Sequence, residues 1–187
     1  MNIILFGPPG AGKGTQAKHL VKKLSNFQIS TGDILREEIK NNSEIGKKII
    51  NVMNDGKFVN DDIVNELLEK HVFDPKKKGK LIFDGYPRSI NQAKNLDLLL
   101  DRSNQQIDFI FFLNVNKDTI IKRIQKRKII EKRLDDELKT ILKRYDTYME
   151  TTKPVLDFYS KNLNFHEIDG TLEIEQITNK IDTFINV

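Results

Sequence analysis

Cysteine is absent from this chain of 187 residues, and histidine occurs only three times. Without cysteine, the chain forms no disulfide and no zinc site built on thiolates. His19, His71 and His166 are too widely scattered for the spacing of a metal site, so we expect each of them to be structural or exposed. We therefore predict no zinc.

Long hydrophobic runs are also lacking. The longest, residues 109–113, has five residues and is far too short to cross a membrane. The first expected strand begins at Met1 or Asn2, so we expect no signal or transit peptide before the fold. No repeat and no linker rich in Pro, Gly or Ser divides the chain. We expect one soluble, cytoplasmic domain that has no membrane partner and is a monomer.

Basic residues exceed acidic ones, which gives a net charge of +4. The sequence pI of about 9.1 raises the alternative of a protein that binds nucleic acid. Lysines are nevertheless mixed with acidic residues along the expected helices, and the only dense run is Lys76-Lys77-Lys78 with Lys80. We interpret this run as a solvated loop and predict no nucleic-acid partner.

Glycines gather in one place, the segment Gly7-Pro8-Pro9-Gly10-Ala11-Gly12-Lys13-Gly14-Thr15. An apolar run precedes it at residues 2–6, and a helical pattern follows it at residues 16–24. This is the context of a P-loop, in which backbone N–H groups and the lysine surround phosphates. The usual P-loop places Ser or Thr directly after the lysine, whereas Gly14 intervenes here before Thr15.

Short strands and helical patterns alternate along the chain, which predicts a P-loop α/β fold with a five-stranded parallel sheet between two layers of helices. In such a fold, ligands bind at the carboxyl ends of the strands. Strands are expected at residues 2–6, 27–30, 81–84, 107–114 and 165–168. Helices are expected at residues 16–24, 31–41, 43–56, 60–72, 89–100, 116–128 and 135–162, the last interrupted by Pro154.

An acidic residue and several arginines are candidates for chemistry. Asp84 ends an apolar strand, as does the carboxylate that positions Mg²⁺ in P-loop proteins. Arg123 and Arg127 are four residues apart on one helix face, and Arg133 and Arg144 are eleven apart, roughly on one face if that segment is helical. With Arg36 and Arg88, these residues suit a site for phosphoryl transfer, because guanidinium groups neutralise phosphate oxygens.

No serine is paired with a histidine in the manner of a nucleophile and its base. An acceptor that is itself a phosphate would be largely a dianion at neutral pH and would need no general base. Positioning and electrostatics would then supply nearly all of the catalysis.

Three other readings fit less well. The glycines lack the third member of a dinucleotide-binding fingerprint, and Asn116-Lys117-Asp118-Thr119 has its acid one residue too early for guanine recognition. We interpret Asn116 as a helix cap. A switch or motor NTPase is disfavoured because no hydroxyl stands next to Lys13.

Six motifs in order resemble the nucleoside monophosphate kinases, and most closely the adenylate kinases, over essentially the full length. The motifs are residues 7–15, Ser30-Thr31-Gly32-Asp33-Ile34-Leu35-Arg36, Asp55-Gly56-Lys57-Phe58-Val59, Phe83-Asp84-Gly85-Tyr86-Pro87-Arg88 with Gln92, residues 123–127, and Arg133-Leu134-Asp135-Asp136 with Arg144.

The resemblance implies Mg²⁺-dependent transfer of the terminal phosphoryl group of ATP to AMP, which gives two ADP. It implies that Mg²⁺ is held by Asp84 through water, and that Lys13, Arg88, Arg123, Arg127, Arg133 and Arg144 are catalytic. It assigns ATP binding to Gly10, Ala11, Gly12, Lys13, Gly14, Thr15, Arg123, Arg127 and Gly170. It assigns AMP binding to Thr31, Arg36, Lys57, Val59, Gly85, Arg88, Gln92, Arg133 and Arg144.

The choice of AMP is the less secure part, because an amide such as that of Gln92 can hydrogen-bond several bases. A kinase of UMP or CMP with the same fold remains an alternative, and a non-catalytic module that binds nucleotide or RNA is another. Phe58 stands where the family has a smaller aliphatic residue, which we expect to narrow or repack the AMP pocket.

The same resemblance divides the chain into a core, a helical insertion that binds the monophosphate, and a short lid. The core comprises residues 1–29, 60–127 and 134–187, the insertion residues 30–59, and the lid residues 128–133. Only five residues separate Arg127 from Arg133, and they lack the glycines and serine common in short lids. We expect the lid to exclude water, which would otherwise accept the phosphoryl group.

Overall fold

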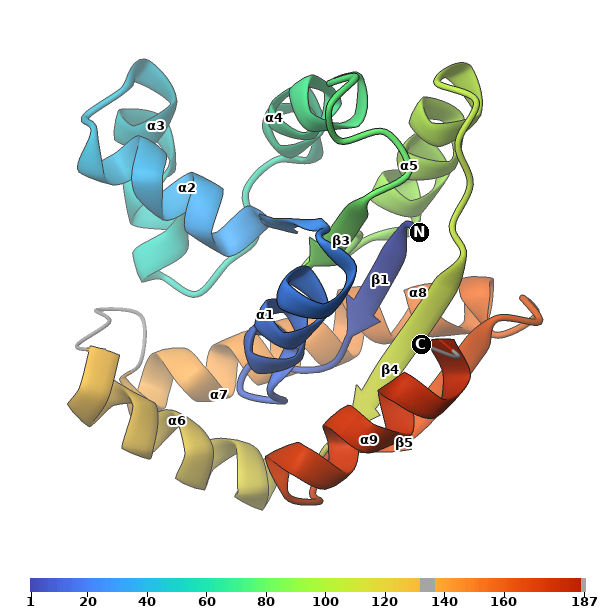
Figure 1. The fold of residues 1–187 in the computed structure, drawn as a ribbon. Coiled ribbons are helices and arrows are strands. Elements are labelled where there is room, and N and C mark those ends of the chain that lie inside the picture. The colour runs from blue at the N-terminus through green and yellow to red at the C-terminus, as the bar shows by residue number, and fades with distance from the viewer. Residues whose placement is uncertain (132–136, 186–187) are drawn as a thin grey trace.

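A parallel sheet lies at the centre of the structure (Figure 1). The structure is a computed structural model and describes residues 1–131 and 137–185. Within these residues, five strands lie in the order β2-β3-β1-β4-β5, and every pairing is parallel. The strands are β1 Ile3–Phe6, β2 Phe27–Ser30, β3 Leu81–Asp84, β4 Phe109–Asn114 and β5 Phe165–Asp169. The predicted fold class and the number of strands are confirmed.

Side chains of the central strands alternate between the two faces of the sheet. In β1, Ile3 and Leu5 join one apolar cluster, whereas Ile4 and Phe6 join the other. All four are at most 2 % exposed, so the strand is buried on both faces, as its continuous apolar sequence predicts. The two clusters form the cores above and below the sheet.

The helices cover both faces and begin where capping residues predict. The side chains of Ser30, Ser43, Asn60 and Ser89 each accept a hydrogen bond from a backbone N–H in the first turn. Helix α1 Lys13–Leu24 follows β1, and three helices follow β2: α2 Thr31–Lys40, α3 Glu44–Asn54 and α4 Asp61–Val72. Those that follow are α5 Ile90–Arg102, α6 Lys117–Glu131, α7 Leu138–Thr147, α8 Lys153–Tyr159 and α9 Ile174–Ile185.

Helices α2 and α3 project to one side of the sheet, apart from the helices that cover its faces (Figure 1). Their sequence is the predicted insertion at residues 30–59. The hydroxyl of Thr31 donates to the carbonyl of Gly85 at 2.7 Å, which joins the start of α2 to the segment after β3. The insertion therefore begins directly at the carboxyl edge of the sheet.

The segment after α6 differs from the predicted single helix with a break at Pro154. The chain forms α7, a π-helix η1 over Tyr148–Thr152, and then α8, whose first turn contains Pro154. Proline lacks an N–H group and is tolerated in the first turn of a helix, where that group would have no partner. The wider turn of the π-helix η1 therefore comes before Pro154, and α8 begins with Pro154 in its first turn. The predicted end at residue 162 is also wrong, because α8 ends at Tyr159.

The sequence analysis assigned no helix after β5, yet α9 follows it and packs on α1. Ile177, Ile181 and Ile185 of α9 are buried at the helical spacing of four residues, which is a signal that the sequence contains. Helix α6 also continues to Glu131, through the first four residues of the predicted lid.

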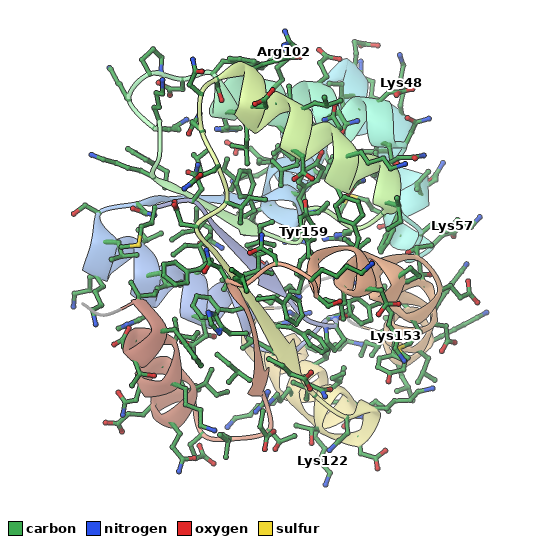
Figure 2. The ribbon with its side chains drawn as sticks, turned by 90° about the vertical axis from the view of Figure 1, so that its right-hand side faces the viewer. Lys48, Lys57, Arg102, Lys122, Lys153 and Tyr159 are labelled. Carbon is green, nitrogen blue, oxygen red and sulfur yellow. The ribbon has the colours of Figure 1, made fainter. Side chains whose placement is uncertain are left out.

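Among the described residues, no helix is both long and apolar enough to cross a membrane. The side chains of Lys48, Lys57, Lys122 and Lys153 extend away from the body, whereas that of Tyr159 lies inside it (Figure 2).

Candidate active site

The loop between β1 and α1 forms an anion site at the carboxyl end of the central strand. Helix α1 begins at Lys13, three residues earlier than predicted, so Lys13, Gly14 and Thr15 form its first turn. Backbone N–H groups of a first turn lack partners within the helix and carry partial positive charge. Gly12 caps α1 with φ of 99°, a conformation that glycine adopts readily. The start of α1 therefore carries the partial positive charge that an anion would need.

Lys13 lies beneath this loop. Its ammonium Nζ donates to the carbonyl of Gly7 at 2.7 Å and to that of Pro8 at 3.1 Å. Burial lowers the pKa of Lys13 to about 8; nearby Asp84 opposes the change, while Arg88, Arg144 and Arg127 contribute to it. The side chain is held ready for an anion, whose negative charge would favour the ammonium form.

Asp84 is the last residue of β3 and pairs with Leu5 of β1, so its carboxylate lies beside the loop. Its Oδ2 accepts a hydrogen bond from Nε2 of Gln28 at 3.0 Å. A Cβ atom added to Gly14 would lie 3.6 Å from this same oxygen. Gly14, the residue that departs from the usual P-loop, therefore faces the carboxylate.

A cavity of about 640 Å³ lies in front of the loop. Residues 9–16 line one wall, and Asp84 lies within it. The cavity also brings together all the predicted arginines that lie in the described residues, although they come from three helices and one loop. These are Arg36, Arg88, Arg123, Arg127 and Arg144. This concentration of guanidinium groups beside an anion site is suited to a polyphosphate.

Arg123 connects two parts of the cavity wall. Its guanidinium donates to the carbonyl of Gly170 at 2.7 Å, and at 3.4 Å to the carbonyls of Ala11 and Leu172. The segment between β5 and α9 is thereby tied to the P-loop. A Cβ atom at Gly170 would lie 2.4 Å from Cγ2 of Val115, so this turn fits only glycine without rearrangement.

A second recess adjoins the cavity at the insertion. It is lined by every predicted AMP-binding residue that the structure describes, namely Thr31, Arg36, Lys57, Val59, Gly85, Arg88, Gln92 and Arg144. Apolar side chains of Leu35, Met53 and Val64 complete the recess. The apolar and charged side chains of this lining match the chemistry of a base attached to a phosphate.

Arg88 and Gln92 are fixed at the base of this recess. The backbone N–H of Arg88 donates to Oε1 of Gln92 at 2.7 Å, and its carbonyl accepts from the hydroxyl of Thr152 at 3.0 Å. The guanidinium Nε of Arg88 donates to the carbonyl of Gly85 at 2.6 Å. Gln92 is only 3 % exposed, and its Nε2 donates to Oδ1 of Asp61 at 2.6 Å.

Comparison with known proteins agrees with this geometry. The adenylate kinase family model matches residues 5–164. The chain is 49 % identical over 213 aligned residues to the adenylate kinase of Pelagibacter ubique, with full coverage of both chains. It is 41 % identical to the adenylate kinase of Caulobacter sp. strain K31, over 100 % of this chain and 99 % of that one. The adenylate kinase of Mycoplasma capricolum is also 41 % identical, over 97 % of each chain.

The chain belongs to the adenylate kinase family. The predicted site residues that the structure describes line one or both of these cavities, except Gly170. Gly170 lines neither, but its carbonyl accepts a hydrogen bond from Arg123, which does. Arg133 and part of the predicted lid lie outside the described residues. The roles assigned to the individual side chains stay predictions.

Some site residues were missed by the sequence analysis. Gln28 reaches the site only because β2 pairs with β3, which places it beside Asp84. The sequence around Asp61 indicates the start of a helix, but the neighbouring residues give no indication that Asp61 accepts a hydrogen bond from Gln92. Ile174 and Ile177 line the larger cavity from α9, the helix that was not predicted.

Lys57 is the least engaged of the predicted residues. Its side chain is 61 % exposed and its Nζ lies 3.3 Å from Oδ2 of Asp55. Figure 2 shows it pointing outward, so the part of Lys57 that contributes to the recess is not its ammonium group. None of the three histidines lines either cavity.

The residues present also fit a magnesium ion. No cluster of three or more side chains suited to a metal occurs in the described part of the chain. Mg²⁺ keeps several waters and is commonly bound by one or two carboxylates together with substrate phosphates. Asp84, beside Lys13 and facing Gly14, offers such a carboxylate next to the expected position of the phosphates.

Proposed function

We propose that this member of the adenylate kinase family is itself an adenylate kinase, which transfers the γ-phosphoryl group of ATP to AMP in the presence of Mg²⁺. An oxygen of the AMP phosphate attacks the γ-phosphorus, and the bond from that phosphorus to the bridging β–γ oxygen breaks. Two ADP molecules result, and the reverse reaction uses the same groups.

The observation that carries this proposal is that the two cavities meet at shared arginines. Arg36, Arg88 and Arg144 line both the cavity in front of the P-loop and the recess of the insertion. Two phosphate-bearing ligands would therefore meet end to end at these side chains. Such an arrangement would bring an acceptor phosphate next to a donor phosphate, and it supports the proposal because phosphoryl transfer depends on this positioning.

The donor side supplies electrostatic stabilisation. In the proposed reaction, the amides of residues 10–15 and the ammonium of Lys13 bind the ATP phosphates, and Arg127 faces the transferred group. Arg123 holds the turn at Gly170, beside which the donor base would lie. Arg133 completes this set as a prediction from the sequence.

The acceptor side needs no general base, because the second pKa of a phosphate monoester is about 6. Arg88 and Arg36 would grip the AMP phosphate, Arg144 the transferred group, and Thr31, Val59 and Gln92 would line the base site. Asp84 would hold Mg²⁺ through water, and the ion would neutralise charge on the β- and γ-phosphates. We further propose that the enzyme acts on free nucleotides as a cytoplasmic monomer.

The direct test is an assay of the purified protein with ATP and Mg²⁺ as donor and with AMP, UMP, CMP or GMP as acceptor, followed by phosphorus NMR. We expect ADP from AMP and no turnover of ATP alone. Faster phosphorylation of UMP or CMP than of AMP would replace the proposed acceptor and support the alternative kinase.

A matched pair of arginine variants separates an enzyme from a module that only binds nucleotide or RNA. R88A removes the guanidinium shared by both cavities, whereas R102A removes an arginine that is 65 % exposed on α5. We expect R88A to lose most of its activity and R102A to keep it. Salt-sensitive RNA binding that ignores R88A would favour the binding module.

A further inference from the structure

Asp61 holds the amide of Gln92 by a pair of contacts at the base of the acceptor recess. Oδ1 of Asp61 accepts from Nε2 of Gln92 at 2.6 Å, and Oδ2 accepts from the hydroxyl of Ser89 at 2.8 Å. That hydroxyl in turn accepts from the backbone N–H of Gln92 at 3.1 Å. One carboxylate thus joins the start of α4 to the start of α5.

These contacts fix which way the Gln92 amide faces. A carboxylate only accepts hydrogen bonds when ionised, so the NH₂ group of Gln92 must face Asp61. A backbone N–H only donates, so the oxygen of Gln92 must face Arg88, where the distance is 2.7 Å. Turning the amide by 180° would break both bonds and would place its oxygen against the carboxylate.

The fixed amide still has groups for a ligand. An amide carries two N–H donors and an oxygen with two lone pairs, and its contacts with the described residues use one of each. One donor and one lone pair remain, and Gln92 lines the recess in which a base would lie. Gln92 therefore presents one donor and one acceptor in a fixed order.

Bases differ in the order in which they match such a pair. Adenine has an amino group at position 6 beside an acceptor at N1, and cytosine has an amino group beside an acceptor at N3. Hypoxanthine, guanine and uracil have the reverse order, an oxygen beside an N–H. Because the guanidinium groups of Arg36 and Arg88, which line both cavities, would hold the phosphate, the base would enter the recess in one sense and could not reverse this order itself.

We infer that Asp61 is a specificity-determining residue, which locks the amide of Gln92 in one orientation. With AMP as the proposed acceptor, this is the orientation that accepts 6-amino or 4-amino bases and rejects 6-oxo or 4-oxo bases. The inference rests on the proposed function and deepens it. Asp61 is a positioning residue, since it acts through Gln92.

The sharpest probe is the pair AMP and IMP, which differ only in the amino or oxo group at position 6. We expect the kcat/KM of the wild-type enzyme to be at least about 100-fold higher for AMP than for IMP, since a mismatched base leaves polar groups unpaired. In D61N the new side chain offers either an oxygen or an NH₂ group to Gln92. The backbone N–H of Arg88 still favours the wild-type orientation, but the turned amide now loses only this one hydrogen bond and no longer meets a carboxylate. The turned orientation is therefore less unfavourable than in the wild type, and the AMP-to-IMP ratio should fall by about tenfold.

Two controls separate selectivity from structure. D62N removes the neighbouring carboxylate in the same helical turn, which is exposed, and should leave the ratio unchanged. If Asp61 acts through Gln92, D61N should have no further effect on the ratio in a Q92A background. CMP and UMP form a second amino and oxo pair, and their ratio should fall in the same direction in D61N.

Several results would overturn the inference. A merely structural role of Asp61 would lower kcat/KM for AMP and IMP by equal factors, which would leave the ratio as in the wild type. An equal shift of the AMP-to-IMP ratio in D62N would show that the effect comes from negative charge at the start of α4 and not from the contact of Asp61 with Gln92. Either result leaves the proposed function intact, whereas a wild-type protein that forms no ADP from ATP and AMP rejects both.

Discussion

The guanidinium carbon Cζ of Arg88 lies 5.0 Å from the centroid of the Phe58 ring. The two residues belong to different parts of the chain, since Phe58 ends the insertion and Arg88 follows β3. Both line the acceptor recess. A ring over the flat face of a guanidinium attracts its charge and leaves the N–H groups in the plane available for phosphate. Phe58 therefore contacts the guanidinium group of Arg88, and we expect it to help orient this side chain.

Replacing Phe58 should weaken AMP binding more than it slows the chemical step. We expect F58L to raise the KM for AMP by about 3- to 10-fold, because a cation–π contact contributes roughly 0.5–2 kcal/mol. F58Y keeps the ring and should retain the wild-type KM. Steady-state kinetics at varied AMP would test this, and an unchanged KM in F58L would show that the ring does not orient Arg88.

Lys13 should impose a pH dependence on ATP capture. Its pKa is about 8 in the structure, so the ammonium is present below pH 8 and is lost as pH rises through this value. We expect kcat/KM for ATP to be level below pH 8 and to fall above it. The profile of kcat should extend to higher pH, because bound phosphates favour the charged lysine.

The control for this profile is K13R, since arginine stays charged over the whole range. Its rate should be lower, but the fall above pH 8 should disappear. A fall that persists in K13R would assign the pH dependence to another group.

Two glycines of the P-loop should differ in their tolerance of alanine. Gly10 and Gly12 have φ of 84° and 99°, so either substitution strains the backbone by about 1–2 kcal/mol. At Gly10 the added Cβ would also lie 2.8 Å from Cγ1 of Ile124, whereas at Gly12 nothing lies within 4 Å. G10A should lower the free energy of unfolding by a further 1–3 kcal/mol or so.

Urea denaturation of both variants measures this difference. The clash can be isolated with I124A, because the effects of G10A and I124A should be less than additive if their side chains collide. Equal stability of G10A and G12A would mean that the loop moves away from α6 without cost.

The hydroxyl of Tyr148 is buried and has no hydrogen-bond partner among the described residues. Burial raises the pKa of this phenol above its usual range. Since an unpaired buried hydroxyl destabilises a fold by about 1–3 kcal/mol, Y148F should keep or increase the free energy of unfolding.

Tyr159 provides the matched control, because it is equally buried but its hydroxyl donates to Oδ1 of Asp97 at 3.1 Å. Y159F should be less stable than the wild type by about 1 kcal/mol. Thermal unfolding of the two variants compares them. If Y148F were the less stable of the two variants, the hydroxyl of Tyr148 in the wild-type protein would have a hydrogen-bond partner in solution.

The capping and glycine signals of the sequence located most elements. Ser43 and Ser89 start helices where their side chains predict, and Asp84 ends a strand as expected. These signals are local, because a cap or a strand end depends on a few neighbouring residues. The π-helix before Pro154 and the extension of α6 to Glu131 were not predicted from these signals.

By itself, the sequence determined the fold class, the family and the residues expected in both nucleotide sites, because the P-loop and the arginine motifs have fixed spacing along the chain. Only the tertiary structure showed that Arg36, Arg88 and Arg144 line both cavities, that Gln28 holds Asp84, and that Asp61 holds Gln92. Gln28 and Asp84 are 56 residues apart in the sequence, and Asp61 and Gln92 are 31 apart. Strand pairing and helix packing bring them together, and no local pattern encodes such contacts.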